Sequence, residues 1–187
     1  MQGELDARHA RAVKRRISEA RLKTPRSLDS FDFAWPAKIN REQVRYLFTL
    51  GFMRETANVV FIGGVGLGKT HLACALAYEA CCRRLPVLFT SAVDIVNALT
   101  EARAHNNLPA ALRRYARPRL LVVDELGYLP LDKLGAELLF QVFCARYENA
   151  STVITTNRAY KDWAKTFAND ATITSAVLDR ITHHCET

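Results

Sequence analysis

One loop constrains the fold of this chain more than any other feature. The segment Gly63-Gly-Val-Gly-Leu-Gly-Lys-Thr70 fits the pattern G-x-x-x-x-G-K-[ST] in full, and it follows a short apolar run, 58–62. Glycines let backbone N–H groups curl around phosphates, and the N-terminus of a helix favours anions. In such a loop Lys69 reaches the β- and γ-phosphates, and the hydroxyl of Thr70 is a ligand for Mg²⁺. The pattern therefore predicts a strand, a phosphate-binding loop and a helix beginning at Lys69.

The remainder of the chain alternates apolar runs with helical stretches. Short apolar runs predict strands at 58–62, 86–90, 120–124 and 151–156. Ser91, followed three residues later by Asp94, predicts the start of a helix. Strands alternating with helices indicate an α/β fold with a mostly parallel sheet and right-handed crossovers. The predicted helices are 1–23, 41–54, 69–84, 91–105, 109–116, 133–147, 160–167 and 174–183.

Polar side chains follow two of the predicted strands. Asp124 and Glu125 come directly after four apolar residues, and Asn157 follows the strand at 151–156. Strands of a parallel sheet end at one edge, where ligands bind in open α/β folds. At that edge Asp124 can hold Mg²⁺, Glu125 can orient or deprotonate the attacking water, and Asn157 can hydrogen-bond the γ-phosphate or that water. The alternatives are a helix cap for the acidic pair and a turn for Asn157.

A cation from a neighbouring subunit can complete a site of this kind. Arg180 follows Asp179 on the last predicted helix. An arginine supplied in trans stabilises the charge of a phosphoryl-transfer transition state. The alternative for Arg180 is an ordinary helix ion pair.

Charge is distributed unevenly along the 187 residues, whose formal net charge is +7. Residues 1–45 carry 11 basic and 6 acidic side chains, and residues 83–119 carry 7 basic and 2 acidic ones. Two basic stretches favour a polyanionic partner, although solvated helix faces would also explain them. No apolar run approaches the roughly 20 residues that span a bilayer, and the polar N-terminus lacks a secretory signal. We therefore expect a cytoplasmic protein that does not contact membranes.

The motifs together resemble those of AAA+ ATPases, and more narrowly of the IstB family. That family comprises the ATPase helpers of insertion-sequence transposition and is itself similar to DnaC-type helicase loaders. The resemblance extends from about residue 11 to 184, and the segment around 125–130 is distinctive for the family. The matching segments include Leu28-Asp-Ser-Phe-Asp-Phe33, Gly68-Lys-Thr-His-Leu-Ala73, Val87-Leu-Phe-Thr90, Asp124-Glu-Leu-Gly-Tyr-Leu-Pro130, Leu138-Leu-Phe-Gln141, Thr156-Asn157 and Leu178-Asp-Arg-Ile-Thr-His-His184.

The resemblance implies a P-loop NTPase of the AAA+ type, with a three-layer α/β/α arrangement, that hydrolyses ATP with Mg²⁺. It makes Asp124 and Glu125 the Walker B pair, Asn157 the sensor-1 residue and Arg180 the candidate arginine finger. Thr70 and Asp124 are then the metal-binding residues. The candidate nucleotide-binding residues, which include the Walker A loop, are Gly63, Gly64, Val65, Gly66, Leu67, Gly68, Lys69, Thr70 and His71.

The same resemblance implies a helper that binds duplex DNA with ATP, assembles into a homo-oligomer and stimulates a partner transposase. In related initiator ATPases the helical insert between the second and third strands contacts DNA. In this chain that insert lies within the basic stretch 83–119. The candidate DNA-binding residues are Arg103, Arg113, Arg114 and Arg117. The basic first helix is expected to bind DNA or the transposase, or to form a solvated face.

The chain departs from the family pattern in two places. Val65 stands where proline is frequent, and the sequence stops at Thr187, before a further strand and lid. We therefore expect a basic N-terminal helical segment, 1–27, followed by a C-terminally truncated AAA+ domain, 28–187. Without the last strand, the strand at 58–62 is expected to be an exposed edge. The alternatives to a transposition helper are a DnaC-type helicase loader and a hydrolysis-deficient DNA-binding remnant.

Overall fold

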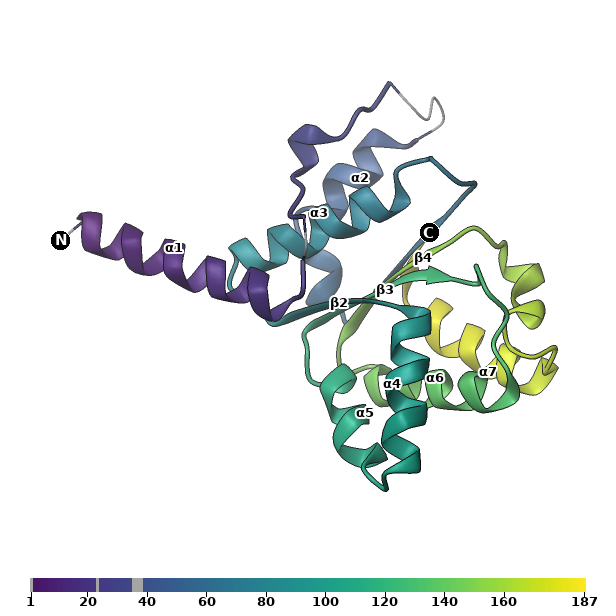
Figure 1. Ribbon diagram of the computed structural model, residues 1–187. Helices are drawn as coiled ribbons and strands as arrows, with labels where there is room; N and C mark the ends of the chain where they lie inside the picture. The colour runs from purple at the N-terminus through teal and green to yellow at the C-terminus, as the bar shows by residue number, and fades with distance from the viewer. Residues whose placement is uncertain (1, 23, 35–38) are drawn as a thin grey trace.

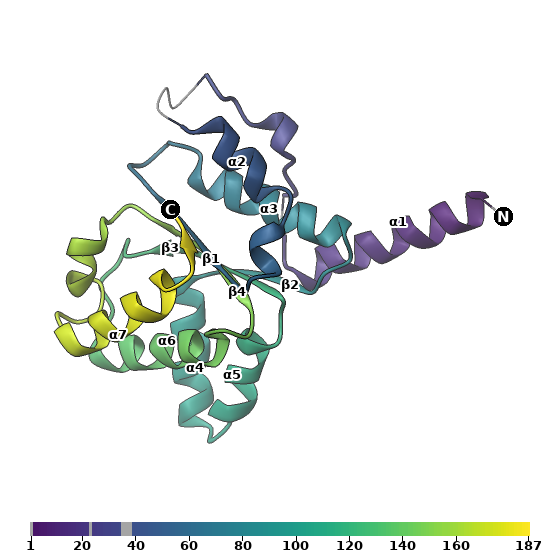
Figure 2. The ribbon, with the colours of Figure 1, turned by 180° about the vertical axis from the view of Figure 1, so that it is seen from behind.

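A computed structural model describes residues 2–22, 24–34 and 39–187. A five-stranded parallel sheet lies between two layers of helices (Figure 1). One layer contains α1 (Gln2–Glu19), α2 (Arg41–Leu47) and α3 (Lys69–Cys82). The other contains α4 (Ala92–Ala104), α5 (Leu108–Ala116), α6 (Lys133–Arg146) and α7 (Ala171–Thr182), as the view from behind also shows (Figure 2). The predicted three-layer α/β fold is confirmed.

The sheet order is β2-β3-β4-β1-β5, with every pair parallel. Alternate residues of each strand face opposite layers, so the sheet is apolar on both faces. In β3, for example, Val122 packs toward α3 and Val123 toward α4 and α6. The strands are β1 (Asn58–Ile62), β2 (Val87–Ser91), β3 (Leu120–Leu126), β4 (Ser151–Thr156) and β5 (Cys185–Glu186).

Most element boundaries lie within a few residues of the predictions, and β1 and β4 coincide with them. Ser91 caps α4, as predicted, because its hydroxyl accepts a hydrogen bond from the backbone N–H of Asp94 at 3.0 Å. The helix predicted over 41–54 is shorter: α2 ends at Leu47, because Leu50 has a φ of +59° that no α-helix continues through. Two short 3₁₀ turns, η2 (Gly51–Met53) and η3 (Tyr160–Lys165), replace the expected helical turns.

The expectation that the sheet lacks its C-terminal strand is wrong. Residues Cys185 and Glu186 pair with the start of β1 as β5, and the N–H of Asn58 donates to the carbonyl of His184 at 2.7 Å. The side chain of Asn58 reinforces this edge, because it donates to Ile181 O at 3.1 Å and accepts from Thr152 N at 2.9 Å. The first half of β1 is therefore covered.

The first helix projects away from the body of the molecule (Figure 1). It is anchored from its middle to its end: Arg84 Nε donates to His9 Nδ1 at 3.1 Å, Ile17 and Ala20 pack against α3, and Phe89 N donates to Ala20 O at 2.9 Å. The predicted first helix is thus present over 2–19, while Met1 and Lys23 lie outside the described residues. Within the described part of the chain, the helices are too short or too polar to cross a bilayer.

Arg146, at the end of α6, holds the α4–α5 hairpin against the sheet. Its side chain is 2% exposed and donates to carbonyls at the end of α5 and the start of β4, including Tyr115 O at 2.8 Å and Pro118 O at 2.9 Å. Its Nε also donates to the hydroxyl of Thr152 at 3.0 Å. Burial lowers the pKa of Arg146 to about 9, so the side chain remains a cation at neutral pH.

We expect Arg146→Ala to destabilise the fold. The substitution leaves several buried carbonyls without donors, which costs about 3 kcal/mol or more. Unfolding in urea, followed by circular dichroism, measures the change in the free energy of unfolding. Arg45→Ala, at an exposed position on α2, is the matched control and is expected to change it by less than about 0.5 kcal/mol. Equal changes in the two variants would contradict this account of Arg146.

Candidate functional site

The glycine-rich loop joins the end of β1 to the start of α3. Gly66 and Gly68 have φ values of +80° and +79°, in the left-handed region that favours glycine. Gly63 N donates to Thr156 O at 3.2 Å, which ties the beginning of the loop to β4. At its other end the N-terminus of α3 offers backbone N–H groups with no partner inside the helix. This geometry suits a bound phosphate chain.

Lys69, in the first turn of α3, lies beside the glycine-rich loop. Its side chain is 9% exposed, and its Nζ donates to Gly64 O at 2.7 Å. Burial lowers the pKa of Lys69, and the nearby carboxylate of Asp124 opposes that shift. A buried cation beside the free N–H groups of the first turn of α3 favours the binding of an anion.

Three oxygen-bearing side chains from three elements meet beside the loop. The hydroxyl of Thr70 donates to Asp124 Oδ1 at 3.0 Å, and the hydroxyl of Thr155 donates to the same atom at 2.5 Å. Asp124 is 7% exposed, at the carboxyl end of β3. Carboxylate and hydroxyl oxygens are the ligands that Mg²⁺ prefers, so Thr70 and Asp124 fit this ion.

Glu125 lies beside this cluster on a strained segment of β3. Its φ is +60°, and the pairing of β3 with β4 shifts in register between Val123 and Leu126. The N–H of Glu125 donates to the hydroxyl of Thr155 at 2.9 Å, which holds the bulge in place. A bulge re-aims one side chain, and here the side chain of Glu125 is exposed at the sheet edge instead of entering a helical layer.

Asn157 is the first residue beyond β4. Thr156, its predecessor, pairs with Ile62 of β1 and Leu126 of β3, so Asn157 emerges at the edge where the loop and the acidic pair lie. Its side chain is exposed. The structure thus brings Lys69, Thr70, Asp124, Glu125 and Asn157 to one edge of the sheet, as the sequence predicted.

Arg180 lies elsewhere. Its guanidinium stacks over the ring of Phe140 at 5.0 Å, and its Nη1 donates to Ala176 O at 3.0 Å. Its backbone carbonyl faces the side chain of Asn58, which begins β1, whereas the glycine-rich loop follows the end of β1. The five residues of β1 separate the two edges by roughly 16 Å. Within one chain, Arg180 is therefore remote from the loop.

The side chain of His71 contacts the N-terminal segment. Its Nε2 lies 3.1 Å from the hydroxyl of Ser30, and its Nδ1 lies 3.3 Å from a guanidinium nitrogen of Arg26. Because a guanidinium can only donate, Nδ1 of His71 is the acceptor in the contact with Arg26. The side chain of His71 thus contacts the N-terminal segment, while its backbone lies in the first turn of α3.

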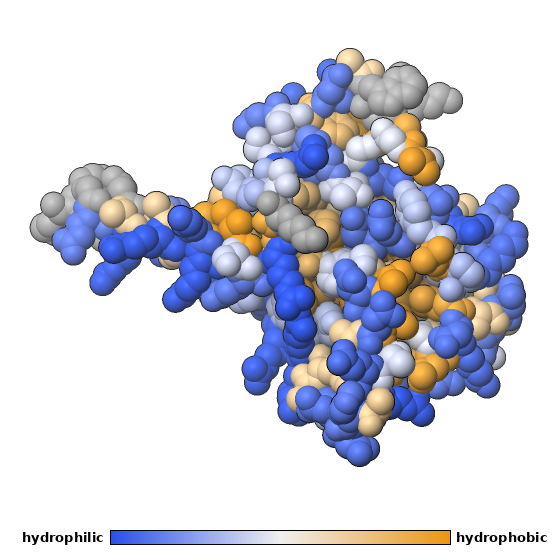
Figure 3. Space-filling model, viewed as in Figure 1, coloured by the Kyte–Doolittle hydropathy of each residue, from blue (hydrophilic) through white to orange (hydrophobic). Residues whose placement is uncertain are grey.

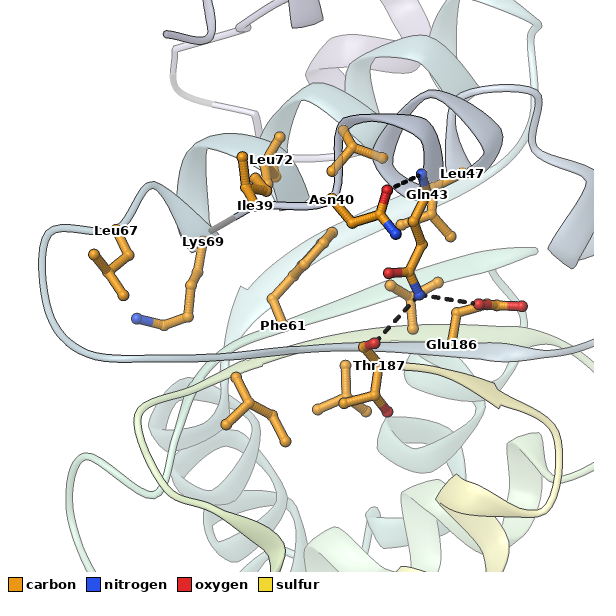
Figure 4. Close-up of a pocket in the computed structure, with 14 residues that line it drawn as sticks. Ile39, Asn40, Gln43, Leu47, Phe61, Leu67, Lys69, Leu72, Glu186 and Thr187 are labelled. Carbon is orange, nitrogen blue, oxygen red and sulfur yellow. Dashed lines mark hydrogen bonds between the residues drawn. The ribbon is translucent and has the colours of Figure 1, made fainter. Parts of the chain in front are cut away.

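A mainly apolar cavity of about 380 Å³ extends from the loop (Figure 4). Phe61 and Leu72 form walls beside Lys69, and Gln43 donates to Glu186 Oε2 at 3.3 Å and to Thr187 O at 3.2 Å. Three segments distant in sequence meet here: α2, the β1–α3 region and β5. Sequence reasoning missed this cavity because its residues share no motif. An apolar slot next to a phosphate site suits a purine base.

The candidate DNA-binding arginines lie together on the α4–α5 hairpin. Arg103 is near the end of α4, Arg113 and Arg114 are on α5, and Arg117 follows α5; all four are exposed. Hydrophilic residues cover much of this hairpin and of α1 (Figure 3). Arg114 also lines a second cavity, of about 840 Å³, whose other walls include Thr70 and Asp124. One cavity therefore joins the hairpin to the candidate metal-binding residues.

Comparisons with known proteins agree with this geometry. The model of the family described as IstB-like ATP binding protein matches residues 1–187. The chain is 37% identical, over 187 residues, to an ATP-binding protein of insertion sequence IS21 from Pseudomonas aeruginosa, covering 100% of this chain and 70% of that protein. It is 35% identical to the corresponding protein of IS5376 from Geobacillus stearothermophilus, covering 98% and 73%.

Among solved structures, a DnaC helicase loader matches with a TM-score of 0.63 and 24% identity, covering 89% of this chain and 96% of that one. The replication initiator DnaA, bound to AMPPCP and single-stranded DNA, matches with a TM-score of 0.69 and 22% identity, covering 83% of this chain. The chain spans about half of the DnaA chain, 48%. These structures support the P-loop AAA+ fold, and the family match confirms the resemblance of the motifs: the chain belongs to the IstB-like ATP-binding proteins.

Proposed function

We propose that this chain is an ATP-dependent DNA-binding ATPase that assists insertion-sequence transposition. The observation that carries the proposal is the joining of Thr70 to Asp124 at 3.0 Å, with Glu125 held beside them on a bulge. Similarity to proteins of insertion sequences IS21 and IS5376 supports the transposition context. Hydrolysis of ATP, assembly on duplex DNA and stimulation of a transposase together make up the proposed activity.

In this proposal the loop from Gly63 to Thr70 cradles the phosphates of ATP, and Lys69 contacts the β- and γ-phosphates. Thr70 and Asp124 hold Mg²⁺, which screens the phosphate charge when bound. The cavity lined by Phe61 and Leu72 receives the adenine base. A base in an apolar slot and phosphates on a rigid loop together orient the γ-phosphoryl group for attack.

Glu125 then takes a proton from the attacking water, whose oxygen forms a bond to the γ-phosphorus. The bond from that phosphorus to the β–γ bridging oxygen breaks, which yields ADP and inorganic phosphate. Asn157 orients the water from the neighbouring strand end. The bulge matters because it leaves the Glu125 carboxylate exposed at the strand end that also carries Asp124, where it can meet the attacking water.

Arg180 completes this site only from a second copy of the chain. It is remote from its own loop, and its side chain is half-buried against Phe140. A homo-oligomer that brings Arg180 of one copy to the γ-phosphate of the next would link hydrolysis to assembly. The arginines of the α4–α5 hairpin contact the phosphates of duplex DNA in that assembly.

A DnaC-type helicase loader is the second candidate function. The favouring observation is that the chain matches nearly the whole of a DnaC helicase loader, 96% of its length. A pull-down distinguishes the two functions, with this chain bound to an ATP analogue and used as the bait. Recovery of a replicative helicase favours the loader, and recovery of a transposase favours the transposition helper.

We expect Glu125→Gln to abolish turnover without abolishing nucleotide binding. The amide keeps the shape of the side chain but cannot accept the proton, so DNA-stimulated ATP turnover falls by about 100-fold or more. Lys69→Ala loses both turnover and affinity for a fluorescent ATP analogue. Glu55→Gln, at an exposed position just before β1, is the control and retains both. Unchanged turnover in Glu125→Gln would exclude it as the base.

Mixing two inactive variants tests the role of Arg180. Arg180→Ala and Glu125→Gln are each expected to be inactive alone. In a mixture, a loop with intact Glu125 can be completed by Arg180 from the other variant, so some sites regain both groups and turnover returns. Turnover that stays at the sum of the separate variants, although both remain folded and assembled, would refute a shared site.

Replacing both Arg113 and Arg114 with alanine is expected to weaken binding to a duplex DNA fragment in the presence of an ATP analogue. Each lost phosphate contact reduces the slope of log affinity against log salt concentration by about 1. Fluorescence anisotropy at several salt concentrations measures the slope. Lys161→Ala, at an exposed position on η3, leaves it unchanged. The same slope in the parent chain, the double variant and Lys161→Ala would mean that DNA does not contact Arg113 and Arg114.

A further inference from the structure

The segment that follows α1 lies directly against the first turns of α3. The turn η1 (Leu28–Ser30) meets His71 through the hydroxyl of Ser30 at 3.1 Å, and Arg26 approaches the other ring nitrogen of His71 at 3.3 Å. One turn farther along α3, the thiol of Cys74 donates to Thr24 O at 3.2 Å. The segment is therefore attached to α3 by side chains just beyond the phosphate-binding loop.

Phe31, the residue after this turn, contacts the loop itself. A Cβ added to Gly68 would lie 2.6 Å from Cε2 of Phe31 and 3.3 Å from its Cζ, so the ring occupies the space beside this glycine. The ring is 8% exposed and packs edge-on against Phe33 at 5.0 Å and His71 at 5.4 Å. These neighbours fix the position of the ring, and the ring in turn limits where Gly68 can move.

The hydrophobic cluster around Phe31 also reaches the candidate base cavity. Phe31 packs with Val44 and Leu72, and both of these side chains line the cavity of about 380 Å³. Gly68, with φ at +79°, is the N-cap of α3, so it determines where the first free N–H groups of that helix point. A single aromatic ring thus buttresses the loop next to the wall of the cavity.

Glycine-rich loops lose much conformational freedom when they close around phosphates, and this loss weakens binding. A residue that holds the loop in its binding conformation beforehand reduces that loss. We propose that Phe31 is a positioning residue for the nucleotide site, which acts by holding Gly68 in the left-handed conformation that directs backbone N–H groups at the phosphates. This inference rests on the proposed binding of ATP.

The experiment compares Phe31→Ala with Phe33→Ala in the full chain. Phe33 belongs to the same cluster and is half-buried, but its ring stacks against Arg41, at 5.6 Å, and it is Phe31 that contacts Gly68. Both variants lose a phenyl ring, so both are expected to unfold at lower urea concentration than the parent chain. Phe31→Ala alone is expected to bind a fluorescent ATP analogue about tenfold more weakly.

Competition by inorganic tripolyphosphate, which has no base, shows whether Phe31 acts on the phosphate-binding loop or on the cavity proposed for the base. The affinity for tripolyphosphate is expected to fall in Phe31→Ala by the same factor as that for the ATP analogue, and to stay unchanged in Phe33→Ala. Phe31→Leu, which keeps an apolar side chain beside Gly68, recovers most of both affinities. The same variant keeps the test decisive if Phe31→Ala does not fold. The Phe31→Leu variant must then still bind the ATP analogue more weakly than the parent chain does.

Equal affinities in the parent chain, Phe31→Ala and Phe31→Leu would overturn the inference. So would equal losses in Phe31→Ala and Phe33→Ala, because the cluster would then act only through stability. A loss for the ATP analogue without a loss for tripolyphosphate would assign Phe31 to the base cavity instead. If the parent chain itself binds neither ligand, the proposed function fails, and that outcome is distinct from all of these.

Discussion

The carboxylate of Asp124 is the point on which the rest of the site depends. Its Oδ1 accepts hydrogen bonds from Thr70 of α3 and from Thr155 of β4, so a helix, its own strand and the neighbouring strand meet at one atom. A buried carboxylate needs such donors, because an unpaired charge at this position would be costly. The same donors align the glycine-rich loop with the end of β3. The loop, the candidate metal-binding oxygens of Thr70 and Asp124, and the end of β3 are therefore held in fixed positions relative to one another.

Local patterns were sufficient to predict much of this frame. The apolar run 58–62, the glycine spacing that follows it and the carboxylates after 120–123 each specify a strand end, and parallel pairing brings strand ends together. The bulge at Glu125 was not predictable, because it depends on Thr155 of another strand donating and accepting around it. The apolar cavity beside the loop was missed for a similar reason: Gln43 and Glu186 meet only after the whole sheet has formed.

The expectation that the sheet lacks its last strand was also wrong for a physical reason. A strand of two residues, Cys185 and Glu186, is too short to show a periodic pattern of apolar residues. It is nevertheless held in place, because it pairs with Asn58 and Val59 of β1. The side chain of Asn58 contacts the end of α7 and the start of β4, and its backbone N–H meets the carbonyl of His184. Asn58 is 94 positions from Thr152 and 123 positions from Ile181 along the sequence. A pattern that is read over a short stretch of sequence cannot include both residues of such a contact.

The cavity of about 380 Å³ connects this edge of the sheet to the proposed nucleotide site. Gln43 of α2 donates to Glu186 Oε2 and to Thr187 O, so α2 lines the cavity on one side and the end of the chain after α7 lines it on the other. A ligand that binds only the folded cavity stabilises every contact that forms it. Occupancy by a nucleotide would therefore strengthen the pairing of β5 with β1, which in turn carries the loop. Because α7, with Arg180, leads directly into β5, the same coupling extends to the residue proposed to reach a second copy. In the proposed function, nucleotide binding and assembly would thus be linked through β1.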